Sequence, residues 1–223
     1  MSGVPYAGLH VLVDDNPRWS LDPVEQAVAA LAGGAAVVQL RVKHATDRET
    51  LAMARAIRKH TRDRSARFVM NDRFDLALAC EADAVHLGQD DLAPGDLPVD
   101  ARSRLAVGRS THDLGQAKRA LEEDIDYLAY GPLFGTTSKD SPYSARGLEA
   151  LREIASLAGA LPVVAIGGID AQNLDAVLAA GARGIAVISA IAGARAPPAA
   201  ARELTGHAAW SAQAVAIESE ARA

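Results

Sequence analysis

The 223-residue chain contains a single cysteine, Cys80, which excludes an intrachain disulfide and is compatible with a reducing compartment. Only 4% of its residues are aromatic, which argues against binding nucleic acid by base stacking. The net charge of −5 and the isoelectric point near 5.7 also argue against a general nucleic-acid binder. We therefore expect a cytoplasmic protein without a nucleic-acid partner.

Long hydrophobic runs are missing as well. No apolar run reaches the roughly 18–20 residues that span a membrane, and residues 1–6 lack the basic start and apolar core of a signal peptide. These absences predict a protein without a membrane partner. What is present is 49% hydrophobic and 23% charged residues, an ordinary composition for an enzyme with a sizeable core.

Eight short apolar runs alternate with amphipathic segments along the whole chain. The runs are Leu9–Val13, Val37–Val42, Phe68–Met70, Ala84–Leu87, Leu105–Val107, Tyr127–Phe134, Val163–Ile166 and Gly184–Ile188. Strands that alternate with helices form right-handed βαβ units and a parallel sheet. Eight units in a chain of this length predict an α/β fold, a (β/α)8 TIM barrel, as a single catalytic domain over residues 1–205. We expect residues 206–223 to form a helical or frayed tail.

The predicted helix ends contain Gly-Ala pairs at Gly33–Ala36 and Gly181–Gly184, directly before predicted strands. Glycine accepts the left-handed conformation that ends many helices, so these pairs mark one end of the barrel. In TIM barrels the functional residues lie at the opposite end, where the strands finish. The residues that follow each predicted strand are therefore the candidates for chemistry.

The second predicted strand ends with alternating polar residues, Gln39, Arg41 and Lys43, which share one face. Arginine offers a planar fork for phosphate oxygens and lysine a compact charge. The alternative is an ordinary strand with an exposed polar face. Because helices cover the outer face of a parallel barrel, we favour an anion-binding site inside it.

Carboxylates follow the third and fourth predicted strands. Asp72 follows Asn71, and Asp91 ends the segment that starts at His86. Two neighbouring carboxylates favour a cation, and oxygen ligands without a Cys or His cluster favour Mg²⁺. The alternative is that Asp72 caps the helix starting near Phe74 and Asp91 lies in a solvated turn. A site for Mg²⁺ and a diphosphate would account for the basic residues of the second strand and for the two carboxylates beside them.

The fifth predicted strand ends in Arg109, Ser110, Thr111 and His112. His112 could serve as a general acid or base, or it could bond a backbone carbonyl or cap a helix, and the sequence does not decide between these roles. Arg109 could simply be solvated. His86, in the middle of the fourth strand, is interpreted as structural.

Loops after the last three predicted strands are typical of phosphate binding. The segment from Phe134 to Asp140 combines a glycine, hydroxyl groups and Lys139, all of which suit a loop around an anion. The seventh strand ends in Gly167–Gly168 and the eighth in Ile188–Ser189. Barrel enzymes frequently bind phosphate at these two loops, so the sequence predicts a second anion site.

Six segments in order resemble one family, and the resemblance extends from Leu9 to Ile191. They are Gln39–Lys43, Asn71–Arg73, His86–Asp91, Ser110–His112, Gly131–Lys139, and Ala165–Ile169 with Val187–Ile191. Together they are similar to the thiamine phosphate synthases. The resemblance implies a transferase of thiamine biosynthesis that couples 4-amino-5-hydroxymethyl-2-methylpyrimidine diphosphate to a thiazole phosphate, releasing thiamine phosphate and pyrophosphate.

The resemblance also implies a role for each matching residue, with Mg²⁺ as the cofactor and small-molecule substrates as the partners. The diphosphate would be held by Gln39, Arg41, Lys43, Asn71 and Lys139, the metal by Asp72 and Asp91, the pyrimidine by Ser110, and the thiazole phosphate by Thr136, Ser138, Gly168, Ile188 and Ser189. Arg41, Lys43, Lys139 and Ser110 would be the catalytic residues. The expected reaction is dissociative, with loss of diphosphate before the thiazole nitrogen attacks.

Two alternatives remain at the level of the sequence. A thiazole tautomerase shares the barrel and the thiazole phosphate site, uses a histidine at the position of His112 and needs no metal-binding carboxylates. A non-catalytic protein that binds thiazole or thiamine phosphates is the other alternative. The presence of both Asp72 and Asp91 favours the synthase, and the set of Arg41, Lys43 and Lys139 suits a diphosphate better than a monophosphate. The sequence leaves open whether the chain forms a homo-oligomer.

Overall fold

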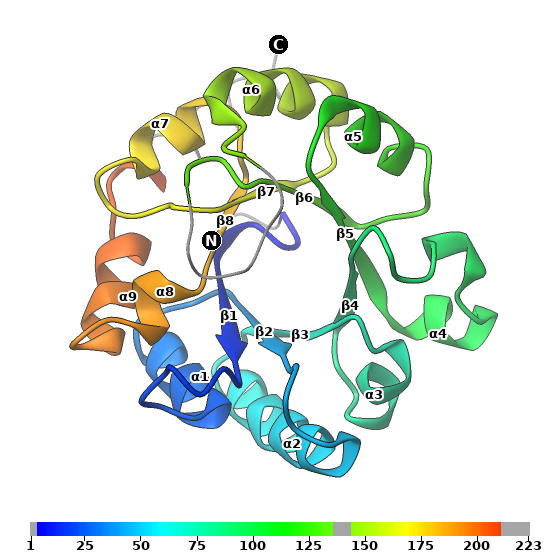
Figure 1. Cartoon of the computed structure of the whole chain (residues 1–223), viewed down its shortest axis with the longest axis vertical. Helices are drawn as coiled ribbons and strands as arrows, with labels where there is room; N and C mark the ends of the chain where they lie inside the picture. Colours follow the sequence, from blue (N-terminus) through cyan, green and yellow to red (C-terminus); the bar gives the residue numbers. More distant parts are fainter. Residues whose placement is uncertain (1–3, 136–143, 211–223) are drawn as a thin grey trace.

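The computed structural model describes residues 4–135 and 144–210, which form a closed barrel of parallel strands (Figure 1). The strands of this part are β1 (Gly8–Asp14), β2 (Val37–Arg41), β3 (Arg67–Asn71), β4 (Ala84–Leu87), β5 (Ala106–Thr111), β6 (Tyr127–Tyr130), β7 (Val163–Ile166) and β8 (Gly184–Val187). Each strand pairs with the next in the sequence, and β8 pairs with β1 to close the barrel. The predicted (β/α)8 TIM barrel is confirmed.

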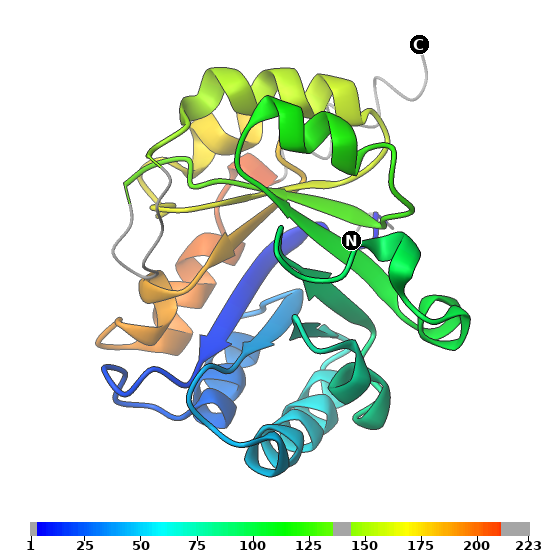
Figure 2. The ribbon, with the colours of Figure 1, turned by 45° about the vertical axis from the view of Figure 1, so that its right-hand side comes forward.

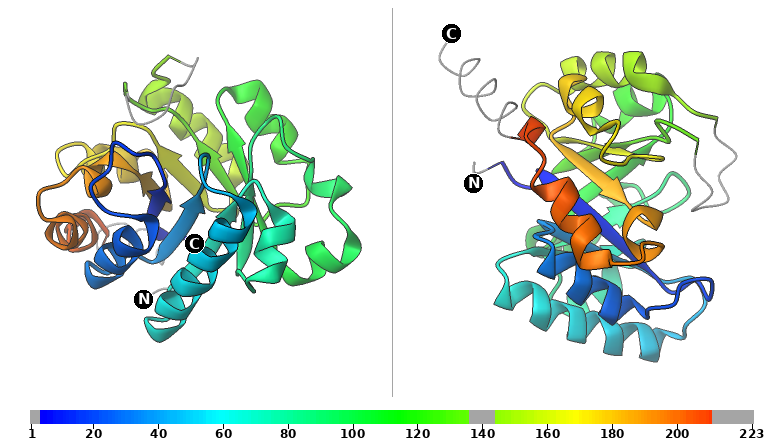
Figure 3. Two further views of the ribbon diagram at one scale, coloured as in Figure 1. Left: turned by 60° about the horizontal axis from the view of Figure 1, so that its bottom comes forward. Right: turned by 90° about the vertical axis from the view of Figure 1, so that its left-hand side faces the viewer.

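The helices surround the strands on the outside (Figures 1 and 2). In the described residues they are α1 (Pro23–Ala32), α2 (Asp47–Asp63), α3 (Phe74–Ala79), α4 (Val99–Arg104), α5 (Leu114–Ala120), α6 (Gly147–Ala158), α7 (Leu174–Ala179), α8 (Ser189–Ala192) and α9 (Pro197–Thr205). Helix α9 packs beside α1, far from it in the sequence (Figure 3). Among the described residues, no helix has the length and hydropathy needed to cross a membrane.

Several strands begin or end at residues other than the predicted ones, and two of these differences matter for the site. Strand β6 ends at Tyr130, before Pro132, which has no backbone N–H for strand pairing. Strand β5 continues to Thr111, so Ser110 lies within a strand rather than after one. The proline-interrupted segment after β4 forms a 3₁₀ turn, Pro94–Asp96, followed by the short helix α4.

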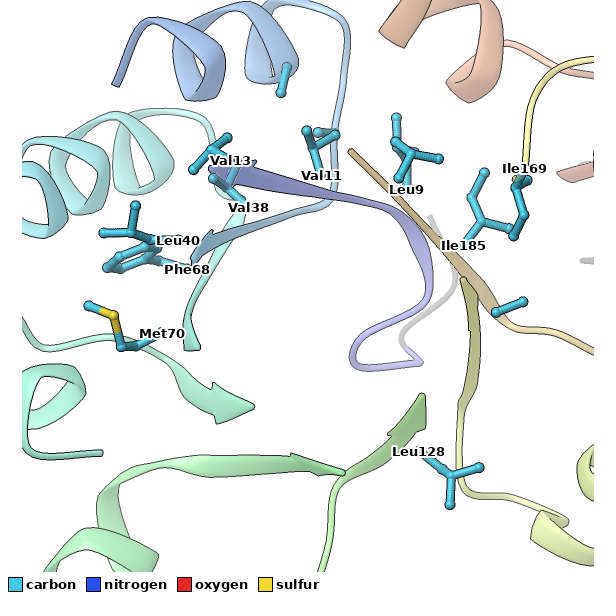
Figure 4. Packing of buried hydrophobic residues seen from close by; sticks show 14 of the residues in the cluster. Leu9, Val11, Val13, Val38, Leu40, Phe68, Met70, Leu128, Ile169 and Ile185 are labelled. Carbon is cyan, nitrogen blue, oxygen red and sulfur yellow. The ribbon is translucent and has the colours of Figure 1, made fainter. Parts of the chain in front are cut away.

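The hydrophobic core has two layers because neighbouring residues of a strand point to opposite faces. The outer layer packs the strands against the helices, and Figure 4 shows Leu9, Val11 and Val13 of β1 pointing to that side. The inner layer fills the barrel itself. It contains Tyr6, Leu12, Val37, Val69, Ala84, Tyr127, Val164, Ala186 and Ile188.

The predicted glycine-rich helix ends lie at the amino-terminal end of the barrel. Gly34 follows α1 with φ +91° and Gly181 follows α7 with φ +97°, both in the left-handed region that favours glycine. Cys80 ends α3, where it is buried and its thiol contacts the carbonyl of Ala77. Burial raises the pKa of Cys80, which keeps the thiol protonated and agrees with a structural role.

Candidate active site

A cavity of about 120 Å³ lies at the carboxyl ends of the strands. Its lining includes five of the predicted site residues, which come from four different parts of the barrel: Gln39 of β2, Ser110 of β5, Gly168 after β7, and Ile188 and Ser189 at the end of β8. Gln39 is only 4% exposed, so its amide is inside the barrel as predicted. The fold therefore places these five residues, which are far apart in the sequence, in one cavity.

A cluster of charged side chains adjoins this cavity where β2 and β3 end. The Lys43 ammonium donates to Asp72 Oδ2 over 2.7 Å. Asp72 has φ +63°, a left-handed conformation that aspartate tolerates better than most residues, and its N–H donates to the carbonyl of His86. The ring of His86 lines the cavity, so one residue connects the cluster to the cavity.

The alternative role of Asp72 as a helix cap is wrong. Arg73 occupies the N-terminal cap position of α3, and no side chain caps that helix end. The Arg73 guanidinium instead bonds the carboxylates of Asp47 and Asp75. Asp72 is thereby available to the site rather than to the helix.

Asp91 lies near Asp72, close enough for the charge of one carboxyl group to act on the other. The backbone N–H of Gly88 donates to Asp91 Oδ2 over 2.6 Å, so Asp91 is not in a simple solvated turn. Burial raises the pKa of Asp91, the Gly88 N–H opposes that rise, and the charge of Asp72 raises the pKa further. Two carboxylates that repel each other at close range form a site that a cation would stabilise.

Arg109 supports the loop that carries Asp91, so the alternative that it is simply solvated is wrong. It is 7% exposed, its Nη1 donates to the carbonyl of Gly88, and its Nε lies 3.2 Å from Glu123 Oε2. Gly88 therefore accepts from Arg109 through its carbonyl and donates to Asp91 through its N–H. The sequence offered no signal for this arrangement, because Glu123 lies in the turn after α5 and nothing in its pattern points to Arg109.

Two acidic residues at the end of β1 hold the basic residues of β2, and neither was predicted from the sequence as part of the site. Asp14 is 3% exposed and forms an ion pair with Arg41. Asp15 accepts from the backbone N–H groups of residues 43, 44 and 45 at 2.8–2.9 Å. Burial raises the pKa of Asp15 and these N–H donors lower it, with a net value below the usual one. Asp15 thus remains charged and fixes the loop that carries Lys43.

Ser110 belongs to a buried polar chain inside the barrel. Its Oγ lies 2.8 Å from His86 Nε2, and His86 Nδ1 lies 3.0 Å from the hydroxyl of Tyr127. The interpretation of His86 as a purely structural residue is therefore incomplete, since the imidazole contacts a predicted pyrimidine-binding residue. The third member is a tyrosine rather than a carboxylate, so the chain differs from a Ser-His-Asp triad.

His112 lines the cavity and bonds a backbone carbonyl, which is one of the roles that the sequence left open for it. Its Nδ1 donates to the carbonyl of Gly131 over 2.6 Å. Its own N–H donates to the side chain of Gln116 in α5. Asp113, and not His112, caps α5.

Two glycines after β7 allow that loop to pack closely against the loop after β6. Gly167 has φ +103°, and a Cβ there would lie 2.6 Å from Pro132 Cα. Gly168 has φ +66°, and a Cβ there would lie 2.7 Å from the carbonyl oxygen of Gly135. Only glycine fits both the backbone conformation and the space.

Four of the predicted site residues take no part in the side-chain contacts given above. Thr136, Ser138 and Lys139 lie outside the described residues. Asn71 ends β3 and is half-buried beside Asp72, with its carbonyl accepting from the N–H of Arg73.

The fold and the site define the class of protein, a TIM-barrel enzyme with its site at the carboxyl ends of the strands. An ionic cluster with two carboxylates and a largely uncharged cavity lie side by side at that end. Such a pair suits a charged group and a ring held next to each other.

Comparisons with known proteins identify the family. The model of the thiamine monophosphate synthase family matches residues 9–191. Thiamine-phosphate synthase from Thermus thermophilus is 47% identical over 199 residues, covering 88% of this chain and 94% of the relative. The protein of the same name from Methanoculleus marisnigri is 45% identical over 196 residues, covering 88% and 92%. The chain belongs to the thiamine monophosphate synthase family.

Solved structures agree with this assignment. Thiamine phosphate pyrophosphorylase from Pyrococcus furiosus superposes with a TM-score of 0.82 at 36% identity, covering 93% of this chain and 96% of that one. A 3-hexulose-6-phosphate synthase superposes with a TM-score of 0.66 at 20% identity, which shows the shared barrel alone. The predicted family and the predicted enzyme class, a transferase, are confirmed.

Proposed function

We propose that this chain couples 4-amino-5-hydroxymethyl-2-methylpyrimidine diphosphate to thiazole phosphate, giving thiamine phosphate and pyrophosphate. The observation that supports this activity most directly is the cluster of Lys43, Asp72 and Asp91 beside the cavity. A tautomerase or a carrier of thiazole phosphate needs no paired carboxylates. The 45–47% identity to proteins named thiamine-phosphate synthase favours the same choice.

Asp72 and Asp91 would hold Mg²⁺. No group of three or more His, Cys, Asp or Glu residues suited to a metal occurs among residues 4–135 and 144–210, so the protein offers two carboxylates. This number fits Mg²⁺, which is usually held by one or two carboxylates together with substrate phosphates and water. When bound, the ion supplies positive charge to the diphosphate as it leaves.

The reaction breaks the bond between the pyrimidine methylene carbon and the diphosphate oxygen, and the electron pair departs with the diphosphate. The thiazole nitrogen then donates its lone pair to the methylene carbon and forms the new C–N bond. Negative charge increases on the leaving group, so Arg41 and Lys43 stabilise the transition state more than the bound substrate. Lys139, outside the described residues, is proposed to act in the same way.

The cavity is proposed to hold the two rings. Gln39 would assist at the diphosphate and Ser110 at the pyrimidine, both from strands whose backbones are fixed by the barrel. Gly168, Ile188 and Ser189 would surround the thiazole phosphate, together with Thr136 and Ser138 of the segment that is not described. We further propose that the enzyme is cytoplasmic, in keeping with its single buried cysteine.

A coupling assay tests the proposed activity. Purified protein is incubated with both substrates, and thiamine phosphate is followed by thiochrome fluorescence after oxidation. We expect product only when both substrates are present. No product from the complete mixture, with turnover of a carboxylated thiazole phosphate alone, would replace the synthase by the tautomerase.

Gly168→Ala is expected to raise the KM for thiazole phosphate by about 10-fold, because a methyl group at φ +66° strains the backbone by roughly 1–2 kcal/mol and meets the carbonyl of Gly135. Gly159→Ala is the matched control: Gly159 has φ +57° at the end of α6, with nothing within 4 Å of the added Cβ. In steady-state kinetics, the KM of the Gly159→Ala control for thiazole phosphate should equal that of the unmodified enzyme. Equal KM values for the two variants would refute the assignment of Gly168 to the thiazole site.

A further inference from the structure

The barrel interior contains a hydrogen-bonded chain that the reaction as described does not explain. Tyr127 of β6, His86 of β4 and Ser110 of β5 all point into the barrel and line the cavity. His86 joins the other two, with Nδ1 3.0 Å from the tyrosine hydroxyl and Nε2 2.8 Å from the serine hydroxyl. The order of donors and acceptors along this chain decides what Ser110 offers to a ligand.

Tyr127 is held rigidly at the inner end of the chain. It is 1% exposed, its ring stacks on Tyr6 with centroids 4.7 Å apart, and it stacks on His86 at 5.5 Å. A Cβ at Gly108 would overlap the phenol, so the glycine provides the space for the ring. Burial raises the pKa of Tyr127 well above its usual value, with smaller contributions from Tyr6 and Asp126, so the hydroxyl keeps its proton.

The Tyr127 hydroxyl is the donor to His86. Within residues 4–135 and 144–210, Nδ1 of His86 is the hydrogen-bond partner of this hydroxyl, and a buried O–H that donates to nothing is costly. A Nδ1 that accepts carries no proton. In a neutral imidazole the proton is then on Nε2, which donates to Ser110 Oγ.

Ser110 therefore accepts from His86 and keeps its own proton for the cavity. A serine hydroxyl that donated to the histidine would present only lone pairs to a ligand. With the opposite order, it presents an O–H to whatever lies in front of it. The tautomer of His86 thus determines which kind of atom the serine selects.

We propose that Tyr127 and His86 are positioning residues that fix Ser110 as a hydrogen-bond donor, so that the site selects a substrate with an acceptor atom, a ring nitrogen of the pyrimidine, opposite Ser110. The proposal rests on the proposed function for the identity of that ring. The two residues act through Ser110 and do not contact the bond that breaks.

Nitrogen-15 NMR of the histidine side chains in the free protein tests the tautomer without substrate. We expect the His86 signal, assigned by its absence from His86→Gln, to show a protonated Nε2 and an unprotonated Nδ1. In Tyr127→Phe, which keeps the ring and removes the hydroxyl, we expect both tautomers to be populated. A protonated Nδ1 in the unmodified protein would overturn the proposal, whether or not the protein has synthase activity.

Kinetics test the consequence for Ser110. Tyr127→Phe is expected to raise the KM for the pyrimidine diphosphate by about 10-fold, with a similar rise for Ser110→Ala. The double variant should show no further rise, because both changes remove the same oriented donor. Tyr130→Phe is the matched control, since Tyr130 is equally buried on the same strand but packs in the outer core layer.

Thermal unfolding of all four variants shows whether a raised KM comes with a less stable core, as lost packing would cause, or without one, as lost positioning of Ser110 would cause. Two results would overturn the proposal in favour of a purely structural tyrosine. One is a KM in the double variant that rises by the product of the Tyr127→Phe and Ser110→Ala increases. The other is a Tyr130→Phe variant whose KM rises as much as that of Tyr127→Phe. If the unmodified protein couples no substrates, the proposed function fails, and the NMR result still decides the tautomer.

Discussion

Asp91→Asn is expected to lower kcat/KM for coupling by at least about 100-fold, equivalent to roughly 2.7 kcal/mol of transition-state stabilisation. Asp72 lies near enough to Asp91 for its charge to raise the pKa of Asp91, and the N–H of Gly88 holds the Asp91 carboxylate in place. An amide at position 91 keeps the shape and removes one of two anionic oxygen donors. Asp72→Asn should cause a similar loss. Steady-state kinetics over a range of Mg²⁺ concentrations measure both variants.

Asp90→Asn is the control for this prediction, because Asp90 precedes Asp91 in the chain but is exposed. It makes the same change in net charge and should retain kcat/KM within about 2-fold. An Asp91→Asn enzyme with unchanged kcat/KM and an unchanged requirement for Mg²⁺ would remove the carboxylate pair from the site.

The second large effect is expected at Lys43. Lys43→Met should lower kcat/KM by about 100-fold, because it removes a cation from the leaving diphosphate and also the partner of Asp72 at 2.7 Å. Methionine retains an unbranched apolar side chain. Kinetics with saturating thiazole phosphate and varied pyrimidine diphosphate should show the loss.

Lys59→Met provides the comparison, since Lys59 is an exposed lysine on α2 outside the cavity. Its kcat/KM should match that of the unmodified enzyme. If Lys43→Met also kept the kcat/KM of the unmodified enzyme, Lys43 would only balance the charge of Asp72 and would make no contribution to departure of the diphosphate.

The barrel could be predicted from the sequence because its signals are local. The apolar runs Ala84–Leu87 and Val163–Ile166 coincide with β4 and β7, and the glycines after α1 and α7 have the expected left-handed φ. Strand ends were harder to predict. The run from Tyr127 to Phe134 is apolar throughout, but Pro132 cannot continue the pairing, and β6 ends at Tyr130.

The position of a site residue could be predicted where it directly follows a strand. Contacts between side chains from different segments of the chain could not. Asp72 and Asp91 lie together as expected, because the carboxyl ends of β3 and β4 adjoin. The ion pair of Arg109 with Glu123 could not be foreseen, since nothing in either segment points to the other. The contact of His86 with Tyr127 likewise depends on the register of strands two positions apart in the barrel.

The most direct measurement is the release of pyrophosphate by the unmodified enzyme, followed together with thiamine phosphate, with Mg²⁺ and with excess EDTA. We expect equimolar pyrophosphate and thiamine phosphate with Mg²⁺, and a fall of both rates by at least about 100-fold with EDTA. Coupling at the same rate in EDTA would contradict the assignment of Asp72 and Asp91 to a magnesium-bound diphosphate.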